Sequence, residues 1–166
     1  NSFNDLLKLQ IKEPLEESKL ALSINGLNTI KDSVSKKVKL QYEENPYPRW
    51  RYSSHSSENR LSISSAVNNE IRPNRVEYPQ KKETYNILVA GCGTGQQILD
   101  ADRYRNSKIT AIDLSKSSIA YANRKIIEYG IKNVEFIQMD ILDLSSMNKK
   151  FDIIECCGVL HHMEEP

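Results

Sequence analysis

The sequence predicts an α/β fold with a parallel sheet of four strands, preceded by a helical N-terminal region. After residue 86, short apolar runs alternate with amphipathic runs, which is typical of strand–helix–strand units. Residues 87–95 read Ile-Leu-Val-Ala-Gly-Cys-Gly-Thr-Gly, a buried strand that enters a turn with three glycines at alternate positions. An acidic residue, Asp113, follows the next apolar run, 18 positions after Gly95. This combination predicts a nucleoside site at the edge of the sheet.

The composition divides the chain into three parts. Residues 1–52 form a helical region that ends in an aromatic and proline-rich segment, residues 53–82 form a linker rich in Ser, Asn and charge, and residues 83–166 form the α/β domain. The formal net charge of +1 gives no global argument for nucleic acid or an anionic membrane. Three cysteines, no membrane-length apolar run and no signal segment indicate free thiols in a reducing cytoplasm.

The N-terminal region has its own helical pattern. Apolar residues at helical spacing in residues 4–24 predict two short helices divided by Pro14. Apolar positions four apart from 34 to 42 predict a third helix that ends before Asn45. A further short helix is expected within the linker, near residues 61–67.

The α/β domain contains regularly alternating elements. Ser115 is the expected N-cap of its second helix, and Gly130 ends that helix. We expect strands at residues 86–90, 108–112, 134–138 and 151–156, with helices at 97–104 and from 115 to 129.

The glycine turn discriminates between ligand classes. A dinucleotide fingerprint, Gly-x-Gly-x-x-Gly, needs glycine at position 96, where this chain has Gln96. A phosphate-binding loop needs a following Gly-Lys-Ser/Thr, which is absent. The turn therefore suits a ligand without a pyrophosphate, although a plain strand-to-helix connection has the same pattern. The candidate loop residues are Gly91, Cys92, Gly93, Thr94 and Gly95.

Two carboxylates follow predicted strands. Asp113 can accept both ribose hydroxyls at the end of its strand, or it can stabilise a helix N-terminus. Asp140 and its following amide can bind the amino group and ring edge of an adenine, with Ile141 against the base, or Asp140 can belong to a simple turn.

The end of the fourth strand carries cysteines and histidines. Cys156 and Cys157 lack Cys-x-x-Cys spacing, so we expect packed thiols whose backbone can hold the amino-acid end of the ligand. His161 and His162 can supply a general base or face the substrate, or they can buttress the loop. With no third ligand in sight, no metal is expected.

These motifs together resemble those of class I S-adenosylmethionine-dependent methyltransferases. The similarity covers four motifs in the correct order, at residues 87–95, 111–115, 138–141 and 151–162. The resemblance implies a Rossmann-like sheet and S-adenosyl-L-methionine as cofactor. It implies that Gly91, Gly93 and Gly95 surround the methionine portion, that Asp113 binds the ribose, and that Leu114 packs on the adenine opposite Asp140 and Ile141.

The family fold has seven strands, of which this chain supplies four in the spatial order 3-2-1-4. We expect the last three to be missing after Pro166, which leaves the fourth strand as an exposed edge that can pair with another chain. A fragment of this kind can be inactive by itself.

The N-terminal segment adds a narrower similarity. Residues 41–50 are similar to a segment that precedes the methyltransferase domain in bacterial proteins with tetratricopeptide repeats, and no repeat is present in this chain. Tyr42, Tyr47, Arg49 and Trp50 are candidates for a flap over the cofactor mouth, or for an aromatic plug that fixes the N-terminal helices to the sheet.

The resulting prediction is methyl transfer to an unidentified protein or small-molecule acceptor. The Asn/Asp-Pro-Pro-Tyr signature of nucleic-acid amine methylation and the Pro-Cys signature of RNA cytosine enzymes are both absent. Two alternatives stay open: a non-catalytic cofactor-binding or protein-interaction module, and a nicotinamide-dependent oxidoreductase.

Overall fold

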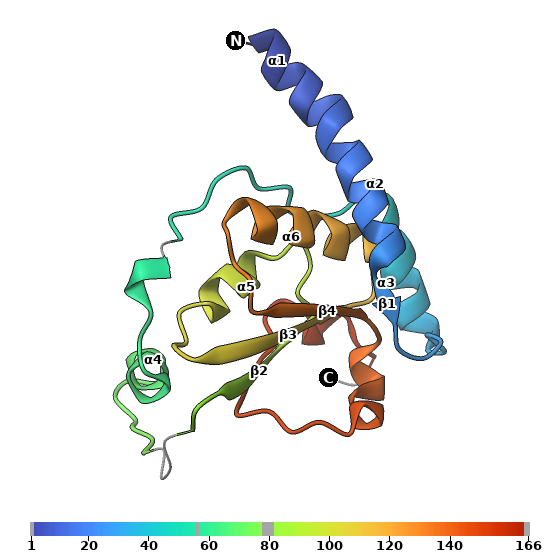
Figure 1. Ribbon diagram of the computed structural model, residues 1–166. Helices are drawn as coiled ribbons and strands as arrows, with labels where there is room; N and C mark the ends of the chain where they lie inside the picture. Colours follow the sequence, from blue (N-terminus) through green and yellow to red (C-terminus); the bar gives the residue numbers. More distant parts are fainter. Residues whose placement is uncertain (1, 56, 78–81, 165–166) are drawn as a thin grey trace.

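The computed structural model describes residues 2–55, 57–77 and 82–164, and its centre is a five-stranded parallel sheet (Figure 1). The strands lie in the order β1-β4-β3-β2-β5, and each hydrogen-bonded pair is parallel. Their bounds are β1 (Asn25–Gly26), β2 (Tyr85–Ala90), β3 (Ser107–Asp113), β4 (Val134–Gln138) and β5 (Ile153–Glu155).

The four strands expected in the α/β domain are present in the expected order 3-2-1-4. The additional strand, β1, pairs with β4 in the register Asn25 to Ile137 and Gly26 to Gln138. The sequence analysis predicted helices up to residue 24 and no strand at these two residues. Because a sheet edge pairs through backbone groups alone, β1 needs no apolar pattern that a sequence could show.

The first helical run differs from its prediction. It runs from α1 (Ser2–Leu7) through a π-helical segment (Lys8–Lys12) into α2 (Glu13–Ser23), without the expected division at Pro14. Pro14 is the second residue of α2, which directly follows the π-helical segment, and the helical run continues through it.

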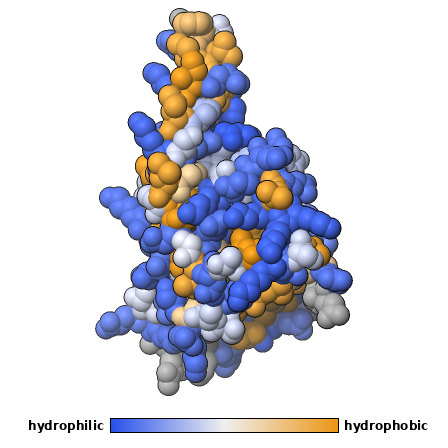
Figure 2. All heavy atoms as spheres, turned by 90° about the vertical axis from the view of Figure 1, so that its right-hand side faces the viewer, coloured by the Kyte–Doolittle hydropathy of each residue, from blue (hydrophilic) through white to orange (hydrophobic). Residues whose placement is uncertain are grey.

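This helical run projects from the body and carries an exposed apolar stripe (Figure 2). The π turn is wider than an α turn, so it brings the side chains after it back into line with those before it. The exposed side chains are Phe3, Leu6, Ile11, Leu15 and Leu22. Among the described helices, none combines the length and the apolar character that crossing a membrane requires.

Four further α-helices complete the described chain, and side-chain caps fix the start of three of them. Asp32 accepts from Ser35 N–H at 2.7 Å, and Ser115 caps its helix as predicted. The helices are α3 (Ser33–Glu44), α4 (Ile63–Glu70), α5 (Gln96–Ala101) and α6 (Lys116–Glu128). The helix predicted at 97–104 therefore ends earlier. In the predicted linker, α4 corresponds to the expected short helix, and residues 56 and 78–81 lie outside the described residues.

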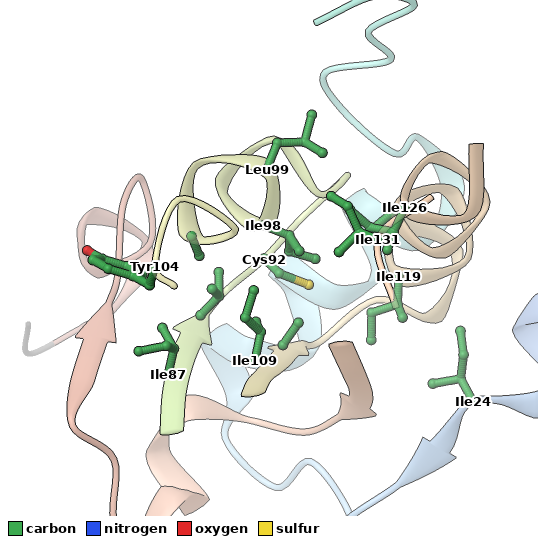
Figure 3. Close-up of a cluster of buried hydrophobic side chains, with 14 of the residues drawn as sticks. Ile24, Ile87, Cys92, Ile98, Leu99, Tyr104, Ile109, Ile119, Ile126 and Ile131 are labelled. Carbon is green, nitrogen blue, oxygen red and sulfur yellow. The ribbon is translucent and has the colours of Figure 1, made fainter. Parts of the chain in front are cut away.

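Alternate residues of the central strands serve two apolar clusters, one on each face of the sheet. Ile87 and Ile109 point to the larger cluster, where α5 and α6 contribute side chains such as Ile98 and Ile119 (Figure 3). On the other face, Leu88 belongs to a smaller cluster with side chains from the 3₁₀ segment Ile141–Met147. This arrangement leaves the carboxyl edge of the sheet for a site.

A buried ion cluster anchors the linker to the end of α5. Asp102 is 0% exposed and accepts two hydrogen bonds from Arg60 Nη2, at 2.6 and 2.8 Å. The His55 Nε2 atom lies 3.2 Å from the same carboxylate. The segment before α4 is thus tied to the sheet through one buried charge.

We expect Asp102→Ala to lower the free energy of unfolding by about 2 kcal/mol, because it removes the charged acceptor of the Arg60 hydrogen bonds. Asp100→Ala, at an exposed position of the same helix, is the control and should change stability by no more than about 0.5 kcal/mol. Denaturant unfolding of both variants measures the difference, and equal stability of the two would contradict an anchoring role.

Candidate functional site

A cavity of about 370 Å³ lies where the loops after β2, β3, β4 and β5 meet. In parallel α/β sheets, ligands bind at this carboxyl edge, and small-molecule sites typically have volumes of roughly 300–1,000 Å³. Helix α3 and the segment after it close the opposite side, through Val38, Tyr42 and Tyr47. The N-terminal region and the α/β domain therefore share one site.

Two glycines of the loop after β2 have different roles. Gly93 has φ +48°, and a Cβ atom added there would meet nothing within 4 Å, so it borders open space in the cavity. Gly95 has φ +91°, and an added Cβ would lie 2.8 Å from the Ala122 Cβ. Gly95 therefore allows α5 to approach α6, and it does not line the cavity.

The Asp113 carboxylate fixes the glycine loop. Its Oδ2 accepts from Gly93 N–H at 2.8 Å, and its Oδ1 accepts from Ser115 N–H at 2.9 Å. Burial raises the pKa of Asp113, and these N–H donors oppose that rise. Since Asp113 lines the cavity and each carboxylate oxygen can accept more than one hydrogen bond, it can still accept from a ligand.

The residues predicted to hold an adenine lie together in the wall of the cavity. Asp140 is 3% exposed, and its Oδ1 accepts from Leu142 N–H at 3.1 Å, which caps the 3₁₀ segment. Ile141 and Leu114 also line the cavity. Both roles considered for Asp140, a turn residue and a cavity residue, are thus combined.

The cysteines contribute little reactive chemistry. Cys157 lines the cavity, and its carbonyl accepts from Gln97 Nε2 at 2.7 Å. Cys156 is not in the lining and packs in the smaller cluster instead. Burial raises the pKa of the Cys156 thiol, and burial, with a smaller contribution from Asp113, raises the pKa of the Cys92 thiol well above its usual range. Within the described residues, no group of three metal-ligating side chains is found.

A tyrosine and a histidine from distant parts of the chain meet at the cavity. The Tyr42 hydroxyl lies 3.2 Å from His162 Nε2, and both side chains line the cavity. Burial, and then the neighbouring His161, lower the pKa of His162, so its imidazole is neutral at pH 7. His161 itself lies outside the lining.

The structure separates the four flap candidates. Tyr42 and Tyr47 line the cavity, but Arg49 and Trp50 do not. Arg49 Nη2 donates to both oxygens of Glu17, each at 3.0 Å. Of the two interpretations left open for Arg49 and Trp50, their position outside the cavity lining favours the aromatic plug.

Trp50 connects the aromatic segment to the glycine loop and to α6. Its indole N–H donates to the Thr94 carbonyl at 3.0 Å, and its ring packs against Tyr121 and Tyr129. The Thr94 hydroxyl donates to the Pro48 carbonyl at 2.6 Å. The aromatic segment is thus bonded directly to the glycine loop.

The cavity lining contains acidic side chains and no Lys or Arg among the described residues. Three carboxylates, of Asp100, Asp113 and Asp140, belong to its lining, and no Lys or Arg occurs among the described lining residues. Such a cavity suits a ligand with positive charge and disfavours the two phosphates of a dinucleotide. This balance argues against the nicotinamide-dependent alternative.

The sequence did not single out Gln97, Asp100 or Val38, which also line the cavity. Gln97 and Asp100 lie three residues apart on α5, directly after the glycine loop, and this placement could have identified them. Gln97 Oε1 is buried without a hydrogen-bond partner among the described residues.

The fold and the cavity are those of an α/β domain with a small-molecule cavity at the carboxyl edge of its sheet. Residues 87–166, just under half of the chain, match the family model described as "Methyltransferase domain". These residues are therefore similar to methyltransferase domains.

Individual proteins and a solved structure are similar to this chain over part of their length. The chain is 34% identical over 127 residues to the uncharacterised protein RP028 of Rickettsia prowazekii, covering 76% of this chain and 48% of that protein. It is 30% identical over 101 residues to a ubiquinone biosynthesis O-methyltransferase of Pseudomonas syringae, covering 58% and 43%. The solved structure of PKMT2 from Rickettsia typhi is 40% identical, with a TM-score of 0.43, over 49% of this chain and 16% of that chain. The chain thus spans less than half the length of these relatives.

Alanine substitutions at Gly93 and at Gly95 should differ in their effects on stability and on cofactor binding. Gly93→Ala should cost about 1–2 kcal/mol of stability for its left-handed backbone, and its methyl group should weaken cofactor binding. Gly95→Ala should cost about 3 kcal/mol, because its methyl group also overlaps Ala122. Thermal unfolding and calorimetric titration with S-adenosylhomocysteine separate the two effects. Equal stability of both variants would contradict the assignment.

Proposed function

We propose that this protein binds S-adenosylmethionine in the cavity and transfers its methyl group to a protein or small-molecule acceptor. The observation that carries the proposal is the cavity itself. Both Gly93, which borders open space, and the Asp113 carboxylate line it, and the described lining contains no Lys or Arg. The bound cofactor supplies an electrophilic methyl group on a sulfonium.

Each end of the cofactor has candidate ligands in the wall. The glycine loop and the backbone at Cys157 adjoin the space for the amino-acid end. Asp113 is placed to accept the ribose hydroxyls, because both of its oxygens keep accepting capacity. Asp140, with Ile141 and Leu114, forms the apolar and polar wall proposed for the adenine.

The acceptor is proposed to enter between α3 and the loop after β5. This part of the wall contains Tyr42, Tyr47 and His162. A neutral His162, held by the Tyr42 hydroxyl, can take the proton of an acceptor hydroxyl or amine as that group is methylated. The chain therefore supplies alignment for the transfer and a site for the proton.

The acceptor class follows from charge and surroundings. The formal net charge is +1, and three carboxylates line the cavity, so a phosphate-rich nucleic acid is disfavoured as an acceptor. The aromatic and apolar side chains near the mouth favour a protein side chain or a small molecule with apolar surface.

Asp113→Ala should weaken S-adenosylhomocysteine binding by about 2 kcal/mol, since a charged hydrogen-bond acceptor is removed. In the wild type, the affinity should fall on acidification, because a protonated Asp113 accepts less well. Burial raises its pKa, so this fall should begin above the pH range of an ordinary aspartate. Isothermal titration calorimetry across pH measures both effects.

Asp143→Asn is the matched control, because Asp143 lies in the neighbouring 3₁₀ segment and outside the cavity lining. It should bind as the wild type does. A wild type that binds NAD but not S-adenosylhomocysteine would refute the proposal.

His162→Gln should leave cofactor binding unchanged and slow methyl transfer about 100-fold, the lower end of the range for general-base catalysis. The assay follows transfer of a labelled methyl group from S-adenosylmethionine to fractionated protein and metabolite pools. Lys37→Gln, at an exposed position of α3 outside the cavity lining, serves as the control. Cofactor binding by the wild type with no labelled product in any pool would instead favour a non-catalytic cofactor-binding module.

A further inference from the structure

A second cavity, of about 230 Å³, lies between the N-terminal helical run and α6. No residue lines both this cavity and the one at the carboxyl edge of the sheet. Part of its wall is the π-helical segment, through Lys8, Leu9 and Gln10, and π-helical turns are rare and frequent at functional sites. We call it the basic cavity because five cationic side chains belong to its lining. They are those of Lys8, Arg49, Arg51, Arg124 and Lys125.

The carboxylates around the basic cavity do not balance its cations. Three carboxylates pair with the five cations, and each carboxylate is shared by two of them. These carboxylates belong to Glu13, Glu17 and Glu128. The Arg124 guanidinium contacts all three, at distances from 2.9 to 3.5 Å. Five positive and three negative charges leave an excess of two positive charges among the described residues, and a partly enclosed excess of this kind attracts anions.

Arg51 is the cation of the basic cavity that is engaged least. Its guanidinium lies 5.6 Å from the Tyr52 ring and forms no ion pair or hydrogen bond with the described residues. Its backbone is nevertheless fixed, because its carbonyl accepts from Lys125 Nζ at 2.8 Å. Lys125 and Arg124 are buried, so an anion bound here would not have to immobilise them. The basic cavity thus combines ordered cationic walls with one guanidinium whose donors remain available.

The charge and the donors of the basic cavity favour one class of anion. A phosphate monoester carries about two negative charges at pH 7, which matches the excess of two, whereas a carboxylate carries one. A guanidinium presents its N–H groups as a planar fork that can donate to two phosphate oxygens at once. A cationic ligand such as a sulfonium is disfavoured here, in contrast to the acidic cavity at the sheet edge.

We propose that the basic cavity is a second ligand site, which binds the phosphate group of a small phosphate monoester through Arg51. The site goes beyond the proposed function. Because no residue lines both cavities, either site can exist without the other.

The test uses Trp50, which is the one tryptophan of the chain and lines the basic cavity, so that its fluorescence reports on this site. The full chain is titrated with glycerol phosphate, with inorganic phosphate as the smallest probe, and with acetate and sodium chloride at matched ionic strength. Both phosphates should change the emission with a saturable dependence on concentration, and acetate and chloride should not. Arg51→Gln should weaken binding of both phosphates about tenfold, because a charged pair of donors is lost.

Arg75→Gln is the matched control, because it removes the same charge at an exposed position outside the lining of the basic cavity, and it should bind as the wild type does. Equal weakening in Arg51→Gln and Arg75→Gln would overturn the inference, since the net charge alone would then explain the binding. A change in emission that sodium chloride reproduces, or binding of inorganic phosphate without glycerol phosphate, would also overturn it. If Arg51→Gln does not fold, Lys8→Gln in the exposed helical run takes its place, and unchanged binding there would count against the site.

Discussion

The carboxylate of Asp113 is the interaction on which the geometry of the site depends. It ends β3, accepts from the Gly93 amide of the loop after β2, and accepts from Ser115 N–H at the start of α6. Burial disfavours its charged form, whereas the backbone donors favour that form. The Asp113 side chain therefore fixes the end of β3, the loop after β2 and the start of α6 relative to one another at the cavity.

The N-terminal region is held by a second set of buried polar contacts. Arg124 of α6 is 5% exposed, and it donates to Glu17 at 2.9 Å and pairs with Glu13 at 3.1 Å. Removing charges from water offsets much of the attraction between them, so such a cluster contributes more to a unique geometry than to stability. Its position matters because α2 leads through β1 to α3. Where α2 lies therefore decides where α3 places Val38 and Tyr42 against the cavity.

The sequence predicted the parts of the fold that depend on local patterns. The alternation of apolar runs specified the strands of the α/β domain, and the glycines with Asp113 located the edge where the cavity lies. It could not predict β1, whose pairing uses only backbone, nor the helical continuity through Pro14, which depends on a π turn. Arg49 and Trp50 were ambiguous for a related reason. An aromatic, basic segment has the same composition whether it covers a ligand or packs between elements, and only tertiary contacts decide.

One wall of the cavity is formed by the ends of adjacent strands, and the opposite wall is formed by contacts between α3 and the loop after β5. The glycine loop, Asp113 and Asp140 lie at adjacent strand ends, so the sheet itself fixes their spacing. The opposite wall joins Tyr42 of α3 to His162 in the loop after β5, and no strand sets that distance. A change in the packing of α3 would therefore reshape the wall at Tyr42 and His162 and leave the wall at the strand ends intact. On the proposed function, the wall that would receive the acceptor therefore depends on the N-terminal region as well as on residues 87–166.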